Sequence, residues 1–240
     1  MSSTSDVTAE QNDPYCMAPA AATDLLSAAP WQRFVVMGDS VAEGLGDTCE
    51  GYGSSPWADR VATALRTVNP GLAYLNLGER DLIASEIRSQ QLDKALSFKG
   101  DLVAVIAGGN DMLRKSFDVD ATEAELARII APLRASGADV ITMGLFDISQ
   151  SDYIPEQYKE GLRARLRLLS DRTHSLSLSH GAVFVDLTSH PAGADTGIYS
   201  KDGRHVNSRG HAVAAAAVIR RLGLHLGVNG LDEAEESAIR

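Results

Sequence analysis

Five short apolar runs alternate with segments of helical periodicity along most of this 240-residue chain. The runs are RFVVMG (33–38), LAYLNL (72–77), DLVAVIAG (101–108), ADVITMGLF (138–146) and AVFVDL (182–187). Near-continuous apolar character is typical of parallel strands that are buried on both faces. Strands that alternate with helices favour a parallel sheet with right-handed crossovers and helices on both faces. The sequence therefore predicts an α/β fold, a three-layer α/β/α sandwich around a five-stranded parallel sheet.

Three of the segments between the runs carry an apolar stripe at helical spacing. The stripes are Trp57/Val61/Leu65/Val68, Leu126/Ile129/Ile130/Leu133 and Tyr158/Leu162/Leu166/Leu169. Thr122 and Glu125 have the spacing of a capping box, which would start the second of these helices. Asn207 or Ser208 is a candidate cap for a last helix through HAVAAAAVIRRL.

The two ends of the chain differ from its middle in composition. Residues 1–20 are polar, with little to bury, and we expect this N-terminal segment to be disordered. A short helix over 21–31 could pack on the domain, and residues 21–228 form a single domain in this interpretation. We expect residues 229–240 to form an acidic, solvated tail.

The net charge of −10 disfavours nucleic acid as a partner, because phosphates would be repelled. No apolar run approaches the ~20 residues of a membrane span, and no signal-peptide pattern is present, so we expect a cytoplasmic protein. Cys16 and Cys49 are the only cysteines, and they lack metal-ligand spacing. They could pair, but reduced thiols are favoured, and Cys49 has no histidine nearby in sequence to make it a nucleophile.

In open parallel sheets, ligands bind beyond the carboxyl ends of the strands. The first run ends at Gly-Asp-Ser, and Ser40 could cap a helix, border an anion site or act as a nucleophile. Gly44 and Gly46 lack the third glycine of a dinucleotide motif, because Cys49 occupies that position, and no Walker or G-x-S-x-G pattern occurs. We therefore expect neither a cofactor nor a metal.

A serine nucleophile needs a base, usually a histidine that an acid orients. Asp202 and His205 lie three residues apart in a glycine-containing loop, which this architecture brings to the same rim as Ser40. Asp171 and His174 have the same spacing, but they lie in a long amphipathic stretch and are interpreted as a solvated pair on a helix. Asn110, in AGGNDML after the third run, could donate its amide to an oxyanion, with a turn residue as the alternative.

These blocks resemble those of the SGNH hydrolases, also called the GDSL esterase/lipase family. FVVMGDSVAEG, AGGNDML and DGRHVNSRGH are similar to the first, third and last family blocks, and the resemblance covers about residues 33–225. The resemblance implies a flavodoxin-like sheet topology, Ser40 as the nucleophile, His205 as the base and Asp202 as the acid. It also implies that Ser40 and Asn110 contribute to the oxyanion hole.

The second family block is where the chain departs from the pattern. Asp81 occupies the position at which the family places a glycine whose N–H binds the oxyanion, and Gly78 is the nearest glycine. The Asp81 backbone could still donate, but its carboxylate would oppose an oxyanion unless it points away or pairs with a cation such as Arg80. Asp39, Arg80 and Tyr52 are further candidates for the substrate pocket, and GDTCEGYGSSPW is predicted to form a loop over it. Trp57 could form a wall of the pocket, but we favour an interpretation in which it anchors the following helix in the core.

The sequence thus predicts a serine ester hydrolase that acts through an acyl-serine intermediate on a small-molecule or acylated metabolite ester. An acyltransferase with the same chemistry and a non-catalytic binding protein on the same fold remain alternatives. No obligate protein partner is evident.

Overall fold

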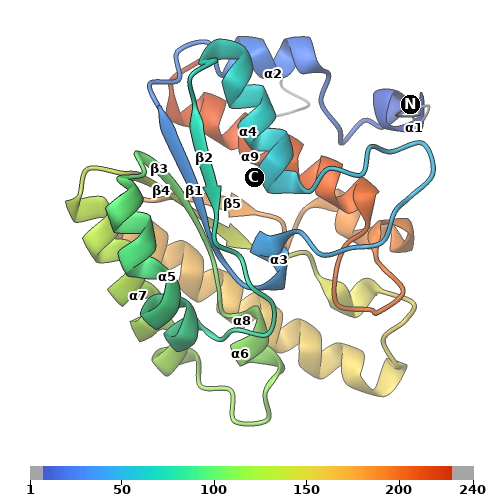
Figure 1. Cartoon of the computed structure of the whole chain (residues 1–240). Helices are drawn as coiled ribbons and strands as arrows, with labels where there is room; N and C mark the ends of the chain where they lie inside the picture. Colours follow the sequence, from blue (N-terminus) through green and yellow to red (C-terminus); the bar gives the residue numbers. More distant parts are fainter. Residues whose placement is uncertain (1–7, 229–240) are drawn as a thin grey trace.

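The computed structural model of the protein describes residues 8–228, and a five-stranded parallel sheet lies at its centre (Figure 1). The strands are β1 (Arg33–Gly38), β2 (Ala73–Asn76), β3 (Leu102–Ile106), β4 (Asp139–Gly144) and β5 (Val183–Asp186). Their order is β2-β1-β3-β4-β5, the flavodoxin-like arrangement. The predicted fold class and all five predicted strands are confirmed.

Helices cover both faces of this sheet (Figure 1). One layer holds α2 (Pro19–Leu25), α4 (Trp57–Val68) and α9 (Ser208–His225), which contact one another. The other layer holds α5 (Ala84–Phe98), α7 (Val119–Ala135) and α8 (Glu156–His180). Three short α-helices complete the set within the described residues: α1 (Thr8–Asn12), α3 (Ser40–Glu43) and α6 (Gly109–Leu113).

Strand β1 shows why the apolar runs are nearly continuous. Phe34 and Val36 belong to the core beneath α2, α4 and α9, whereas Val35 and Met37 belong to the core beneath α5 and α7. All four side chains are fully buried. Burial on both faces removes the polar alternation that a half-exposed strand would show.

The helix starts agree with the sequence only in part. Asn207 caps α9, since its side chain accepts hydrogen bonds from the backbone N–H groups of Arg209 and Gly210. The capping box predicted from Thr122 and Glu125 is wrong, because the cap of α7 is Asp118, four residues earlier. A single carboxylate that accepts two N–H groups already satisfies this helix end.

The expectation of disorder for residues 1–20 is wrong for the part that the structure describes. Helices α1 and α2 form within residues 8–20 and just beyond, and Glu10 pairs with Arg60 of α4 at 2.6 Å. Asp13 accepts a hydrogen bond from Arg209 of α9 at 2.7 Å. The polar residues that suggested disorder instead attach this segment to the domain. Residues 1–7, and the predicted acidic tail at 229–240, lie outside the described residues.

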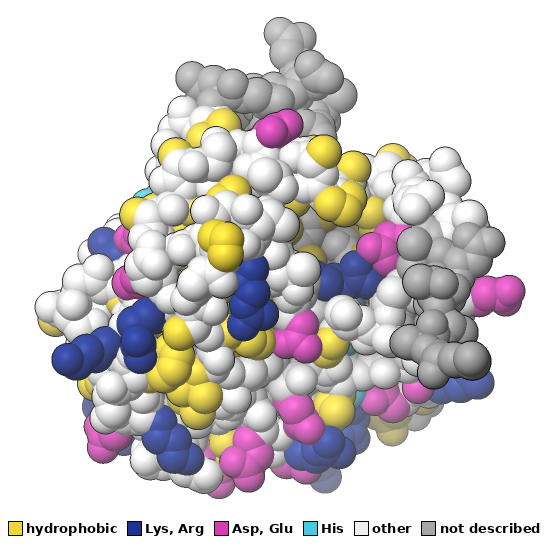
Figure 2. Space-filling model, turned by 45° about the horizontal axis from the view of Figure 1, so that its top comes forward, with side chains coloured by type: hydrophobic (Ala, Val, Ile, Leu, Met, Phe, Trp, Pro, Cys, Tyr) yellow, Lys and Arg dark blue, Asp and Glu magenta, His cyan; other side chains and the backbone are white. Residues whose placement is uncertain are grey.

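Figure 2 views the molecule from the side of α2 and α4, where acidic and basic side chains are interspersed around hydrophobic ones. A groove of about 430 Å³ opens between the α1–α2 segment, α4 and α9. Small side chains such as Ala64, Ala212 and Ala216 form its floor, and they allow α4 and α9 to pack closely. No helix within residues 8–228 is both long and apolar enough to cross a membrane.

Candidate active site

The turn after β1 presents Ser40 at the carboxyl edge of the sheet. Gly38 has a φ of +149°, and a Cβ there would lie 2.1 Å from the carbonyl oxygen of Ile106 in β3, so only glycine fits. Asp39 then caps α3, because its carboxylate accepts the Val41 N–H at 3.0 Å. Ser40 is therefore the first residue of a helix, held at a fixed place beyond two central strands.

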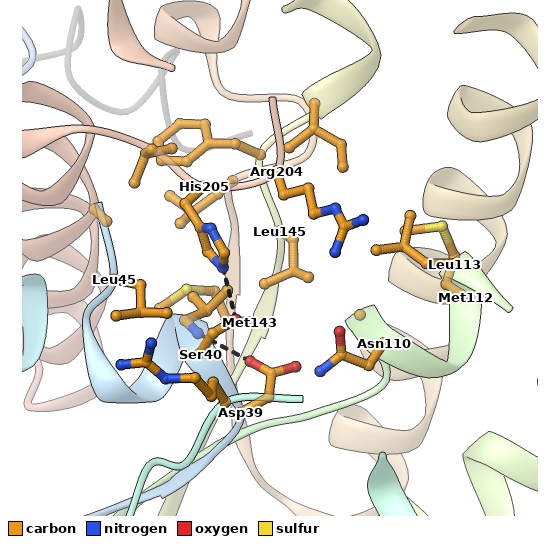
Figure 3. Close-up of a pocket in the computed structure, with 18 of the residues that line it drawn as sticks. Asp39, Ser40, Leu45, Asn110, Met112, Leu113, Met143, Leu145, Arg204 and His205 are labelled. Carbon is orange, nitrogen blue, oxygen red and sulfur yellow. Dashed lines mark hydrogen bonds between the residues drawn. The ribbon is translucent and has the colours of Figure 1, made fainter. Parts of the chain in front are cut away.

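Ser40, His205 and Asp202 form a continuous chain of hydrogen bonds, and Figure 3 shows the bond between His205 and Ser40. The Ser40 Oγ lies 2.7 Å from His205 Nε2, and His205 Nδ1 lies 2.6 Å from Asp202 Oδ2. Because the carboxylate can only accept, Nδ1 carries the proton and Nε2 is left to accept from the Ser40 hydroxyl. The predicted nucleophile, base and acid therefore lie together, although 162 and 165 residues separate Ser40 from Asp202 and His205 in sequence.

The surroundings of Asp202 favour the ionised form of its carboxyl group. Burial opposes its ionisation, but hydrogen bonds from the His205 side chain and from the N–H groups of Arg204 and His205 outweigh burial, and its pKa is lowered. Asp202 Oδ1 accepts the two backbone N–H groups at 2.9 and 3.0 Å. The loop thus holds an ionised carboxylate in place to orient the imidazole.

A second histidine, His211, lies beside this chain but cannot replace His205. Its Nε2 lies 3.2 Å from the Leu45 carbonyl, and its Nδ1 accepts the Trp57 N–H at 3.4 Å. Burial lowers the His211 pKa to about 4. Both ring nitrogens are occupied by backbone groups, so His211 holds the segment after α3 in place.

Three N–H groups around Ser40 are candidates to bind an oxyanion. The Asn110 amide donates one hydrogen to the Leu82 carbonyl at 3.0 Å, which orients the side chain and leaves its second hydrogen available. Within the described residues, the backbone N–H groups of Ser40 and Asp81 donate to no protein acceptor. Ser40, Asp81 and Asn110 all line one pocket.

Gly78, the predicted alternative to Asp81, is unavailable as a donor. Its N–H donates to Asn76 Oδ1 at 2.8 Å. A Cβ at this position would lie 2.2 Å from the backbone nitrogen of Glu43. Gly78 is therefore required for the close approach of the β2 loop to α3, which carries Ser40.

Asp81 has the backbone conformation of a glycine. Its φ is +69°, in the left-handed region that side chains other than those of Asn and Asp rarely adopt. The Asp81 side chain is exposed, and Arg80 does not pair with it, since the Arg80 guanidinium binds Glu43 at 2.6 Å. The chain thus keeps the glycine-like turn while adding a carboxylate at the pocket.

Asp39, a further predicted pocket residue, lines the pocket beneath Ser40 and is almost fully buried. Burial raises its pKa to about 6, despite the Val41 N–H bond and the nearby His205, both of which favour the charged form. A buried carboxylate is costly to ionise. The hydrogen bond that Asp39 accepts from the Val41 N–H, as the cap of α3, offsets part of this cost.

The pocket itself has a volume of about 130 Å³ and is mainly apolar. The apolar lining comes from Leu45, Met112, Leu113, Met143, Leu145, Phe146, Ile148, Leu166 and Leu187. Several of these residues directly follow β4, whose strand end the sequence interpretation did not consider. The rule that ligands bind beyond strand ends would have identified Leu145 and Phe146.

Comparison with known proteins agrees with this geometry. Residues 36–213 match the GDSL-like lipase/acylhydrolase family. The chain belongs to this family. The match covers most of the chain and includes all of the residues described above, and it makes the protein an esterase-type hydrolase. No curated protein matches the chain.

Solved structures of two other enzymes share the fold. A catalytic mutant of Axe2, an acetylxylan esterase from Geobacillus stearothermophilus, is 19% identical, with a TM-score of 0.66 over 80% of this chain and 94% of that one. LAE5, an alpha/beta hydrolase enzyme from the metagenome of Lake Arreo, Spain, is 20% identical, with a TM-score of 0.64 over 80% of this chain and 95% of that one. At these identities the likeness shows the fold alone.

The prediction that residues 46–57 form a loop over the pocket is wrong, because no residue of 46–56 lines the pocket. Tyr52 does not line the pocket, since its hydroxyl donates to Asp13 at 2.8 Å and faces the N-terminal segment. Asp47, in the same segment, forms hydrogen bonds with Ser200 and Lys201, in the loop that carries Asp202 and His205. Trp57 is a core anchor, 1% exposed, whose indole N–H donates to the Val41 carbonyl, and one edge of it also lines the pocket.

The remaining candidates lie away from the site. Asp171 and His174 are on α8, and neither lines the pocket. Cys16 and Cys49 are free thiols. Across residues 8–228, no cluster of three histidine, cysteine or acidic side chains could hold a metal ion.

Proposed function

We propose that the protein is a serine ester hydrolase that works through an acyl-serine intermediate. The observation that carries the proposal is the hydrogen-bonded chain from Ser40 through His205 to Asp202, at the mouth of a small apolar pocket. An isolated serine is inert at neutral pH, and a neutral imidazole at 2.7 Å is the base that activates it. The substrate class is an acyl ester of a small molecule.

The first half of the reaction forms the acyl-enzyme. His205 Nε2 takes the Ser40 proton as the Ser40 Oγ attacks the ester carbonyl carbon, and Asp202 stabilises the resulting imidazolium. The negative charge that moves onto the carbonyl oxygen is met by the N–H groups of Ser40 and Asp81 and by the Asn110 amide. When the carbon–oxygen bond to the alcohol breaks, His205 returns its proton to the departing oxygen.

The second half repeats these steps with water. His205 takes a proton from a water molecule, whose oxygen attacks the acyl carbon, and the proton then passes to Ser40 as the free acid leaves. The pocket beside Ser40 is small, with a volume of about 130 Å³, which favours a short acyl group. The acetyl group named for the acetylxylan esterase Axe2 is of that size.

Replacing the nucleophile tests the proposal. Ser40→Ala should lower kcat for 4-nitrophenyl acetate by more than about a thousandfold, since the loss of one member disables the whole catalytic unit. A fluorophosphonate should label the wild-type protein once per chain and should not label Ser40→Ala. Unchanged turnover in the variant, at equal thermal stability, would remove Ser40 from the mechanism. Transfer of the acyl group to an added alcohol in preference to water would instead indicate an acyltransferase.

A further inference from the structure

Arg204 is a cation without a protein partner at the pocket. It lies between Asp202 and His205, and its side chain extends into the pocket beside Leu113 (Figure 3). Within residues 8–228 its guanidinium forms no hydrogen bond, ion pair or aromatic contact. Arg80, the other arginine of the pocket, is already paired with Glu43.

The carboxylates of the same pocket do not neutralise Arg204. Asp39 and Asp81 both line the pocket, but neither forms an ion pair with it. In Figure 3 Asp39 and the Arg204 guanidinium lie on opposite sides of the cavity, with Leu145 between them. An anion bound at Arg204 would therefore lie away from the buried carboxylate beneath Ser40.

The surroundings of Arg204 make a neutral ligand a poor match. Met112, Leu113 and Leu145 present only carbon and sulfur atoms on this side of the pocket. Arg204 is exposed, so its guanidinium keeps contact with water, and a neutral ester in the pocket would gain no hydrogen bond from it. A carboxylate or phosphate would accept two parallel N–H bonds from the planar guanidinium.

We infer that the pocket selects esters that carry a carboxylate or phosphate group, with Arg204 as the residue that determines this specificity. The inference rests on the proposed function, and it narrows the substrate class from acyl esters in general to anionic ones. Charge-assisted hydrogen bonds of this kind correspond to a preference of about 10- to 100-fold. The preference should weaken as ionic strength rises, because salt screens exposed charges.

Two matched substrate pairs test the inference and locate the anion. The first compares 4-nitrophenyl butyrate with 4-nitrophenyl hydrogen succinate, which places the carboxylate on the acyl part. The second compares phenyl acetate with 3-acetoxybenzoate, which places it on the alcohol part. In at least one pair the wild-type protein should show a kcat/KM about 10- to 100-fold higher for the anionic ester.

Arg204→Gln should abolish that preference, whereas Arg204→Lys should keep part of it. Lys201→Gln is the matched control, since it removes one positive charge from the same loop at an exposed residue that does not line the pocket. The control should keep the wild-type preference. A wild-type ratio near one in both pairs, or the same ratio in Arg204→Gln as in the wild type, would overturn the inference.

These outcomes are distinct from a failure of the proposed function. If a Ser40-dependent activity hydrolyses neutral and anionic esters equally well, the specificity role of Arg204 is contradicted and the ester hydrolase proposal is kept. If no ester of either pair is hydrolysed and a fluorophosphonate does not label Ser40, the ester hydrolase proposal falls, and the inference with it.

Discussion

At the scale of single residues, Asp81 is the main departure from the family pattern. Left-handed backbone at a non-glycine residue occurs within residues 8–228 only at Asp81 and Lys99. Such a conformation costs roughly 1–2 kcal/mol for most side chains, and less for Asp or Asn. The turn keeps the backbone that a glycine would adopt, so its N–H can still face the substrate. What differs is a negative charge close to the place where an oxyanion would form.

We therefore expect Asp81→Asn to raise kcat for a neutral ester by about threefold. This is the effect of removing the repulsion between two unit charges that are about 6 Å apart in water. Asn tolerates the same backbone conformation, so the comparison isolates the charge. Glu79→Gln is the matched control, since Glu79 is exposed and does not line the pocket. Steady-state kinetics below 50 mM salt is the measurement, and equal kcat values in the wild type and Asp81→Asn would mean that the carboxylate faces away from the reaction.

At the residue level, the side chains that the structure brings together at the candidate site could be picked out where they stand in short spacings. Asp202 and His205 lie three residues apart in one loop, and Ser40 is the second residue after a strand, so their types and positions could be recognised locally. Arg204 lies inside the same quoted block, but its lack of a partner depends on which carboxylates fold near it. Tyr52 was misplaced for the same reason, because Asp13 reaches it from the other side of the loop.

At the scale of elements, the contact between the β2 loop and α3 determines where Ser40 lies. Gly78 packs against the backbone of α3, and the Asn76 amide donates to the Ala42 carbonyl of that helix at 2.8 Å. Strand β2 and α3 thus form one unit beneath the site. A shift of this unit would change the distance between the Ser40 hydroxyl and His205.

Gly78→Ala should reduce both stability and activity. The new methyl group would lie 2.2 Å from the Glu43 nitrogen and 2.5 Å from the Ala42 carbonyl carbon, so α3 must move. Overpacking of this kind costs about 1–3 kcal/mol, and a displacement of about 1 Å at a reacting group can cost about a hundredfold in rate. Urea unfolding and kcat/KM are the measurements.

Gly71→Ala is the control for this change, because a Cβ there meets nothing within 4 Å. It should leave both quantities as in the wild type. Full activity in Gly78→Ala would mean that α3 does not depend on this contact for its position.

The elements themselves were predictable to different degrees. The strands were found because burial on both faces leaves an apolar run that needs no tertiary information. Helix α2 overlaps the short helix expected over 21–31, but α1 was missed in the polar segment, because this segment is held by Arg60 and Arg209, which lie 50 and 196 residues away from Glu10 and Asp13. Composition alone cannot show such pairs.

At the scale of the whole molecule, polar contacts join the N-terminal segment to the site. Arg209 lies one turn after His205 and binds both Asp13 and Asp195. These contacts hold its pKa above the usual value, and burial opposes that shift only in part. The N-terminal segment is thus connected to the helix that follows the His205 loop. The stability of the fold and the geometry of the site therefore depend on the same buried polar groups.

Buried histidines make this stability depend on pH. Burial lowers the pKa values of His190 and His211 to about 4, from a usual value near 6.5. Between these values the unfolded chain binds protons that the folded protein does not, so stability is present above pH 6.5 and falls as the pH drops toward 4. Each shift corresponds to at most about 3 kcal/mol. Asp39 acts in the opposite direction, because its pKa is raised to about 6 and its burial becomes less costly in acid.

These three groups should together lower the free energy of unfolding by roughly 3 kcal/mol between pH 7 and pH 4, the net of two losses and one gain of similar size. Carboxyl groups whose pKa values are lowered, such as Asp13 and Glu125, act in the same direction as the histidines. Urea titrations at pH 7, 5.5 and 4 measure the free energy of unfolding. His190→Asn should flatten the dependence, because the Asn side chain can still accept the Ala192 N–H that His190 Nδ1 binds at 3.2 Å. Asp39→Asn should steepen it, since the compensating gain is removed while the cap on α3 is kept. A wild-type protein equally stable at pH 7 and pH 4, or the opposite ordering of the two variants, would contradict this assignment of the buried charges.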